Sequence, residues 1–190
     1  MYNKKDHYHK KAKQEGYLAR SAYKLKEIQE KFRILKPHSR VLDLGCSPGA
    51  WSQVALELLG EKGKITGIDL EQVSLSDPRL EFILGDIFAV DVAGLPGAPF
   101  DCILSDMAPK TSGIKVRDQT RSYELAEYAV ALCDSALAKG GNLLLKVFEG
   151  PDLQKLAQEI RARFAKVERI RPDSTRQASA EIYFLGLNKK

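Results

Sequence analysis

The chain has few cysteines and no long apolar segment. Its 190 residues include three cysteines, Cys46, Cys102 and Cys133, which lie far apart and form no C-x-x-C pair. This spacing predicts buried, reduced thiols, and no His or Cys cluster has metal-ligand spacing. No apolar run approaches the roughly 20 residues that a membrane-spanning helix needs, and the polar N-terminus lacks a signal-peptide core. We therefore expect a cytoplasmic protein with no metal.

Positive charge is concentrated at the N-terminus. The net charge is +5, yet residues 1–40 contain twelve Lys or Arg against four Asp or Glu, so the remainder is slightly acidic. Tyrosines at positions 2, 8, 17 and 23 lie among these cations, and together they could contact phosphates and stack on bases. A solvated helix face would show the same charge pattern.

The length fits one domain, residues 1–190, with 1–39 as a basic extension packed on it.

Apolar β-rich runs alternate with helical patterns from residue 40 onward, which predicts an α/β fold. Strands are expected at 40–44, 64–70, 80–84, 100–105, 142–148, 167–171 and 182–187. Helices are expected near 50–59, 121–138 and 151–164, with a weaker one near 87–93. Gly140-Gly141 would end the second of these helices. Only the polar stretch 173–180 separates the last two strands, so the final strand should be antiparallel to its neighbour. We expect an otherwise mostly parallel, Rossmann-like sheet covered by helices on both faces.

An amphipathic helix is expected ahead of the sheet. Apolar residues recur there at steps of three and four: Leu18, Ala22, Leu25, Ile28 and Phe32. This spacing forms one apolar helix face that packs on the domain. The helix would carry Arg20, Lys24 and Lys26 to the same region.

A glycine turn follows the first expected strand. Residues 41–51 read Val-Leu-Asp-Leu-Gly-Cys-Ser-Pro-Gly-Ala-Trp, so Gly45 and Gly49 are spaced G-x-x-x-G. The turn lacks the middle glycine of the G-x-G-x-x-G dinucleotide fingerprint. Asp43 beside it suits a cationic ammonium and would repel a diphosphate. These features favour a ligand with an amino acid end, and a nicotinamide-dependent oxidoreductase is the weaker alternative.

Two further aspartates end successive strands. Asp69 closes the second strand, where doubly wound folds place an acid that binds ribose hydroxyls. Asp86 follows the third strand, where a carboxylate can accept a hydrogen bond from an exocyclic amine. An amino acid end, a ribose and an adenine without phosphate describe S-adenosylmethionine. Each aspartate alone could be a solvated strand end, but their succession favours this cofactor.

Three more ionisable residues interrupt or border apolar strands. Asp106 follows the fourth strand, Lys146 lies within the fifth and Glu181 begins the last. A lysine in such a strand is costly to bury unless it is paired or reaches water. A structural ion pair with Asp106 or Glu181 would explain Lys146 equally well without any catalytic role.

Several motifs resemble those of the FtsJ family of RNA ribose 2′-O-methyltransferases, also called RrmJ or RlmE. These are SAYKL at 21–25, DLGCSPGAWSQ at 43–53, SDMAP at 105–109, LKVFEG at 145–150 and RPDS at 171–174. The resemblance runs from about residue 10 to the C-terminus, with departures only at 71–78 and 94–99. It implies the S-adenosylmethionine methyltransferase fold and a catalytic tetrad formed here by Lys24, Asp106, Lys146 and Glu181.

The resemblance also implies the binding residues. The cofactor is expected to contact Asp43, Gly45, Ser47, Pro48, Gly49, Trp51, Asp69, Asp86 and Asp106. RNA is expected to contact Lys10, Lys11, Lys13, Arg20 and Arg176. Phosphate contacts of this kind position RNA without specifying its sequence.

The resemblance implies 2′-O-methylation of a uridine in the A-loop of large-subunit ribosomal RNA, a step of ribosome biogenesis, by a monomeric enzyme. Methylation of a tRNA anticodon loop or an mRNA cap is the alternative, and a non-catalytic RNA-binding module is a third. Lys146 is the residue expected to act on the hydroxyl. It would be either a general base or a fixed cation that orients the oxygen, because neighbouring carboxylates and cations shift its pKa in opposite directions.

Overall fold

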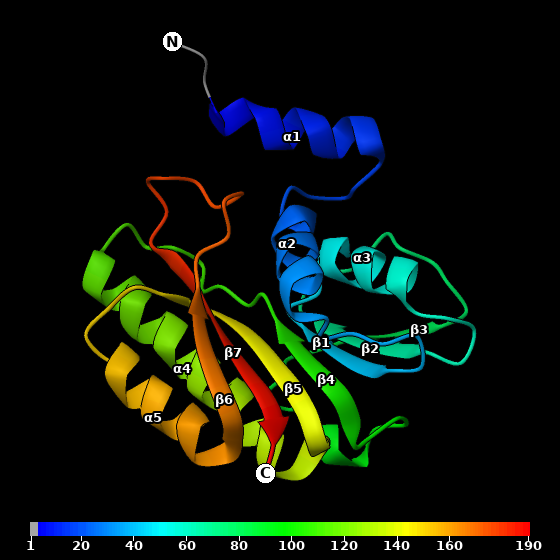
Figure 1. Ribbon diagram of the computed structural model, residues 1–190. Helices are drawn as coiled ribbons and strands as arrows, with labels where there is room; N and C mark the ends of the chain where they lie inside the picture. Colours follow the sequence, from blue (N-terminus) through cyan, green and yellow to red (C-terminus); the bar gives the residue numbers. More distant parts are fainter. Residues whose placement is uncertain (1–3) are drawn as a thin grey trace.

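The computed structural model describes residues 4–190, with side chains from His7 onward. Residues 1–3, which include Tyr2 and the start of the expected domain, lie outside the described residues. The described chain forms a seven-stranded sheet in the order β3-β2-β1-β4-β5-β7-β6 (Figure 1). The strands are β1 (Arg40–Leu44), β2 (Lys64–Asp69), β3 (Leu80–Leu84), β4 (Phe100–Ser105), β5 (Leu137–Phe148), β6 (Phe164–Ile170) and β7 (Glu181–Lys189). The helices are α1 (Lys4–Glu15), α2 (Ala22–Phe32), α3 (Ala50–Leu58), α4 (Lys115–Ala136) and α5 (Leu153–Arg163).

Helices cover both faces of this sheet, as the sequence predicts. In Figure 1, α4 and α5 lie on one face, and α2 and α3 on the other. Successive residues of a strand point to opposite faces, so Leu143 packs in the core under α4 and α5, whereas Leu144 packs in the core under α2 and α3. Both residues are fully buried. The central strands are therefore apolar on both faces, which explains their continuous apolar runs.

The final strand is antiparallel, as expected. β7 pairs antiparallel with both β5 and β6, whereas β1 to β5 pair in parallel. Because of this reversal, Glu181 at the start of β7 lies opposite Phe148 at the end of β5, and Tyr183 lies opposite Lys146. Residues from the beginning of β7 thus reach the sheet edge at which the parallel strands end.

Several predictions about local structure are wrong. β5 begins at Leu137 instead of 142, and β6 begins at Phe164 instead of 167. Residues 87–93 form no α-helix, and only a short 3₁₀ turn at Val92–Gly94 is present. α4 starts at Lys115, six residues before the predicted 121, and ends at Ala136 instead of continuing to Gly140-Gly141. Both glycines lie inside β5, where a Cβ on the second would come within 3.0 Å of the Asp101 carbonyl oxygen. They permit the irregular pairing of β4 with β5 and do not mark a helix end.

The three cysteines are buried and unpaired, as predicted. α1 is a helix of its own, separated from α2 by a short connection (Figure 1). Within residues 4–190 no helix is long and apolar enough to cross a membrane. In the same part of the chain, no group of three or more His, Cys, Asp or Glu could hold a metal ion.

Candidate active site

A cavity of about 770 Å³ opens at the carboxyl edge of the sheet. It lies beside the point where the strand order reverses between β1 and β4, the usual ligand position in open α/β sheets. Its lining combines the glycine turn, the ends of β2 and β3, and the loop after β4. The lining residues include Gly45, Ser47, Asp69, Asp86, Phe88, Asp106, Met107, Lys110 and Arg121.

Gly45 allows the chain to turn tightly at the cavity wall. Its φ is +71°, and an added Cβ would lie 2.7 Å from Met107 Cγ and 3.0 Å from Met107 Cα. The Gly45 N–H donates to the Ile68 carbonyl at the end of β2. This position therefore requires glycine both for its backbone conformation and for the close approach of the loop after β4.

Two carboxylates in the lining are fixed by backbone N–H groups. Asp69 accepts a hydrogen bond from the Ser47 N–H and another from the Glu71 N–H, both at 2.8 Å. Asp86 accepts one at 3.0 Å from the Phe88 N–H. The carboxylates thus face the cavity in fixed orientations, as a nucleoside-binding site requires.

Four of the nine expected cofactor residues do not line the cavity. They are Asp43, Pro48, Gly49 and Trp51. Trp51 is buried instead, donates from Nε1 to the Ser21 carbonyl at 2.9 Å, and packs 5.9 Å from the Tyr183 ring. It joins α3 to the start of α2 and does not face the cavity.

Asp43 lies behind the glycine turn and is fully buried. Its Oδ2 accepts a hydrogen bond from the Ser52 hydroxyl at 2.7 Å, and among the described residues no cation forms an ion pair with it. Burial raises the pKa of Asp43 to about 7, helped by the charges of Asp106 and Asp69 and opposed by the Ser52 hydrogen bond. A direct contact between this carboxylate and a cofactor ammonium is not what the geometry favours.

Asp43 should make the protein less stable as the pH rises from 5 to 7. In this range the folded carboxyl, with its pKa near 7, keeps a proton that the unfolded chain has already released. Stability falls with pH wherever the folded state binds more protons, by up to about 1.4 kcal/mol per pH unit for one group. Asp43→Asn should remove this slope, as measured by urea unfolding without cofactor at several pH values.

Asp134→Asn provides a control for that experiment. Asp134 pairs with Arg163, whose hydrogen bond holds the pKa of the carboxyl below its usual value, so its proton equilibrium lies below this pH window. The control should retain the wild-type slope between pH 5 and 7. If Asp43→Asn also retains this slope, Asp43 is not the group that causes the loss of stability.

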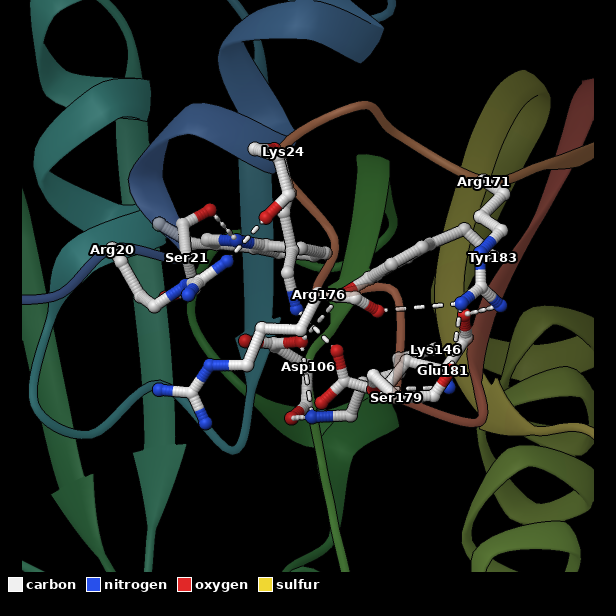
Figure 2. A network of polar contacts seen from close by, with 12 residues as sticks. Arg20, Ser21, Lys24, Asp106, Lys146, Arg171, Arg176, Ser179, Glu181 and Tyr183 are labelled. Carbon is white, nitrogen blue, oxygen red and sulfur yellow. Dashed lines mark hydrogen bonds and ion pairs between the residues drawn. The ribbon is translucent and has the colours of Figure 1, made fainter. Parts of the chain in front are cut away.

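The four residues of the expected tetrad converge in two ion pairs (Figure 2). Lys146 Nζ lies 3.1 Å from Asp106 Oδ1 and also donates to the Asp106 carbonyl. Lys24 Nζ donates to Glu181 Oε2 at 2.5 Å. Both lysines are buried, with 7% and 6% of their surface exposed. α2, the loop after β4, β5 and β7 thus each contribute one charged side chain to a single site.

Opposite charges balance within this cluster. Burial acts to raise the pKa of Glu181, but the charges of Lys24 and Lys146, with hydrogen bonds from Lys24 and Ser179, outweigh it and lower the pKa. Glu181 is therefore a carboxylate at neutral pH. It accepts the hydrogen bond from Lys24 Nζ and so fixes the position of that side chain.

Tyr183 also belongs to the site, although the sequence motifs do not predict it. Its hydroxyl donates to Asp106 Oδ1 at 3.3 Å, and Lys24 Nζ lies 5.4 Å from its ring centre. Burial and the nearby charges of Asp106 and Glu181 raise its pKa well above the ordinary value. Residues two apart in a strand point to the same face, so Tyr183 could be expected on the same side of the sheet as Glu181.

The residues expected to bind RNA lie on two elements. Lys13 is exposed on α1, whereas Lys11 is half-buried and pairs with Glu15 at 3.9 Å. Lys10 lies on the same helix. Arg20 and Arg176 instead lie beside the tetrad, at the start of α2 and in the β6–β7 loop (Figure 2). The expected RNA surface therefore reaches the catalytic cluster through these two arginines.

Comparison with known proteins gives a consistent family match. Residues 17–189 match the FtsJ-like methyltransferase family. The ribosomal RNA large subunit methyltransferase E of Bdellovibrio bacteriovorus is 48% identical, over 100% of this chain and 99% of the relative. The enzyme of the same name from Syntrophobacter fumaroxidans is 45% identical, over 98% and 96%.

Solved structures share the fold. A candidate ribosomal RNA methyltransferase from Plasmodium falciparum superposes with a TM-score of 0.78 and 32% identity, covering 91% of this chain and 98% of its own. A candidate hemolysin from Lactococcus lactis, only 16% identical, gives a TM-score of 0.65 over 90% and 88% of the two chains. The second match shows the fold alone.

Proposed function

The chain belongs to the FtsJ-like methyltransferase family, and from this premise we propose that it methylates a ribose 2′-hydroxyl of large-subunit ribosomal RNA, at a uridine of the A-loop. The observation that carries the proposal is the convergence of Lys146–Asp106 and Lys24–Glu181 beside the cavity. The relatives named above act on large-subunit RNA by name. A non-catalytic RNA-binding module would need no such buried, mutually paired tetrad.

The cavity fits S-adenosylmethionine, the cofactor of this enzyme. We assign Asp69 to the ribose hydroxyls and Asp86 to the adenine amine, because both carboxylates line the cavity in fixed orientations. Gly45 and Ser47 form the wall that the amino acid end would approach. The bound cofactor supplies an electrophilic methyl group on its sulfonium.

Lys146 is the residue we assign to the reacting hydroxyl. Its described contacts are the carboxylate and carbonyl of Asp106, so it occupies the site as a hydrogen-bond donor. A buried cation at this position orients the 2′-oxygen and stabilises its developing negative charge. Of the two roles left open by the sequence, we therefore propose the orienting cation. Lys24, fixed by Glu181, would hold the substrate ribose from the other side.

The RNA would lie across the edge that carries α1, α2 and the β6–β7 loop. We propose that Lys10, Lys11 and Lys13 contact its phosphates, which would position the substrate without reading its sequence. We treat residues 1–190 as one methyltransferase domain, with 1–39 as the RNA-binding extension. We further propose that the enzyme acts as a monomer in the cytoplasm.

Transfer of labelled methyl groups tests this function. Large ribosomal subunits lacking the modification, free large-subunit RNA and bulk tRNA are each incubated with the protein and labelled S-adenosylmethionine. Label on the subunit or its RNA is the expected result. Label only on tRNA would overturn the substrate, and no label on any of them despite cofactor binding would overturn the function.

A further inference from the structure

Four buried side-chain polar atoms have no hydrogen-bond partner within the described part of the chain. Three of them belong to one junction, between the start of α2 and the β6–β7 loop. They are Arg20 Nη1, Ser174 Oγ and Thr175 Oγ1. Because folded proteins pair nearly all buried polar atoms, such a concentration points to a ligand with several acceptor oxygens.

The junction is held in shape by contacts between segments far apart in the sequence. Arg20 Nη2 donates to the Ser174 carbonyl. Glu27 of α2 accepts the N–H groups of Asp173, at 2.7 Å, and Ser174, at 3.1 Å. These contacts fix residues 173–174 against α2 at the level of Arg20.

Arg171 fixes the other end of the loop. Its Nη2 donates to the carbonyls of Arg176 at 3.3 Å, Gln177 at 3.2 Å and Ser179 at 2.7 Å, as Figure 2 shows in part. A single guanidinium thus gathers the backbone around Arg176. The loop is pre-organised, so little ordering would be needed when a ligand binds.

Two positive charges lie close together at this junction. Burial lowers the pKa of Arg20, and the charge of Arg176 lowers it further. The Arg176 side chain is exposed and has no acid partner in the described chain, and Figure 2 shows it on the same side of the catalytic cluster as Arg20. Neighbouring guanidiniums repel each other unless an anion lies between them, and phosphate oxygens match their donor geometry.

We infer that Arg20, Arg176 and the hydroxyls of Ser174 and Thr175 form a phosphate site for the phosphodiester attached to the ribose that is methylated. Arg20 lies just before α2 and precedes Lys24 of the tetrad by four residues. In RNA the 2′-hydroxyl and the 3′-phosphate are on adjacent ring carbons, so the 3′-phosphate is the group within reach. The site deepens the proposed function and rests on it.

Salt dependence distinguishes one phosphate site from general attraction. Each phosphate contact contributes about 0.7 to 0.9 to the slope of log affinity against log salt. Arg20→Gln and Arg176→Gln should each raise KM for the RNA substrate about tenfold or more and lower this slope by about one contact. The double variant should lower the slope of log affinity against log salt no further than either single variant does, because both arginines bind the same phosphate.

Two further variants separate geometry from charge. Arg20→Lys keeps the charge but removes the bidentate guanidinium donor. Ser174→Ala combined with Thr175→Val removes the two hydroxyls without changing the charge. Both should raise KM while leaving S-adenosylmethionine affinity, measured by calorimetry, unchanged. Arg161→Gln removes an exposed arginine from α5 and should behave as wild type.

The experiment measures kcat and KM with large ribosomal subunits at several salt concentrations, and direct binding of an A-loop RNA. The site is overturned if Arg20→Gln and Arg176→Gln match Arg161→Gln, if their slope losses add, or if the hydroxyl variant matches wild type. If wild-type protein transfers no methyl, the proposed function fails. In that case the salt dependence of direct RNA binding, compared among the same variants, tests whether the phosphate site exists.

Discussion

Lys146→Ala should reduce methyl transfer by about a hundred- to ten-thousand-fold, the range typical of a lost proton-handling or charge-stabilising group. The Lys146 ammonium lies 3.1 Å from Asp106, and Asp106 lines the cavity. Lys146 itself is not part of the lining, so the affinity for S-adenosylmethionine should change little. Single-turnover kinetics with ribosomal subunits and calorimetry with the cofactor measure the two quantities separately.

Two controls accompany this variant. Lys155→Ala removes a lysine whose side chain is 62% exposed and pairs with Glu127, and it should leave transfer unchanged. Because Lys146→Ala leaves Asp106 without its cation, a melting curve must show that the variant is folded, and Lys146→Gln offers a milder replacement. Substantial turnover by either folded variant would contradict the assignment of Lys146.

Gly45→Ala should weaken S-adenosylmethionine binding by more than about thirtyfold. The left-handed backbone conformation costs a residue with a Cβ roughly 1–2 kcal/mol. In addition, the new Cβ would lie 2.7 Å from Met107 Cγ and 3.0 Å from Met107 Cα, which belongs to the backbone. Overpacking of this kind adds about 1–3 kcal/mol. Relief of the clash would move the loop after β4 away from the glycine turn. Tenfold in affinity corresponds to about 1.4 kcal/mol, and calorimetry measures it.

Gly140→Ala is the matched control. Its φ of +77° is close to that of Gly45, but an added Cβ there meets no heavy atom within 4 Å. The backbone strain is therefore similar, while the collision and the proximity to the cavity are absent. Gly140→Ala should lose stability without losing cofactor affinity. Equal affinities for the two variants would contradict the role assigned to the turn.

The sequence predicts three of the first four strands well. The expected bounds of β1, β3 and β4 agree with those observed. These strands are short apolar runs flanked by turns, so local pattern and tertiary packing agree. The sequence does not predict the start of α4 because its first turn has no buried apolar side chain. This turn is held locally by Asp118, which accepts hydrogen bonds from the Ser112 N–H and hydroxyl.

The candidate site is predictable where it follows from topology. Carboxyl ends of parallel strands meet at one edge, so the grouping of Asp69, Asp86 and Asp106 could be expected from their positions alone. The burial of Asp43 could not, because it depends on how α3 places Ser52. The junction of Arg20 with Ser174 joins residues 154 apart in the chain, and no local pattern encodes it.

The most direct test of the account is to identify the methylated nucleoside. Large ribosomal subunits lacking the modification are incubated with the protein and S-adenosylmethionine, and their RNA is digested to nucleosides for mass spectrometry. The account predicts one new 2′-O-methyluridine, located in the A-loop, and none with Lys146→Ala. A methyl group on a base, or a ribose methyl formed equally by Lys146→Ala, would contradict it.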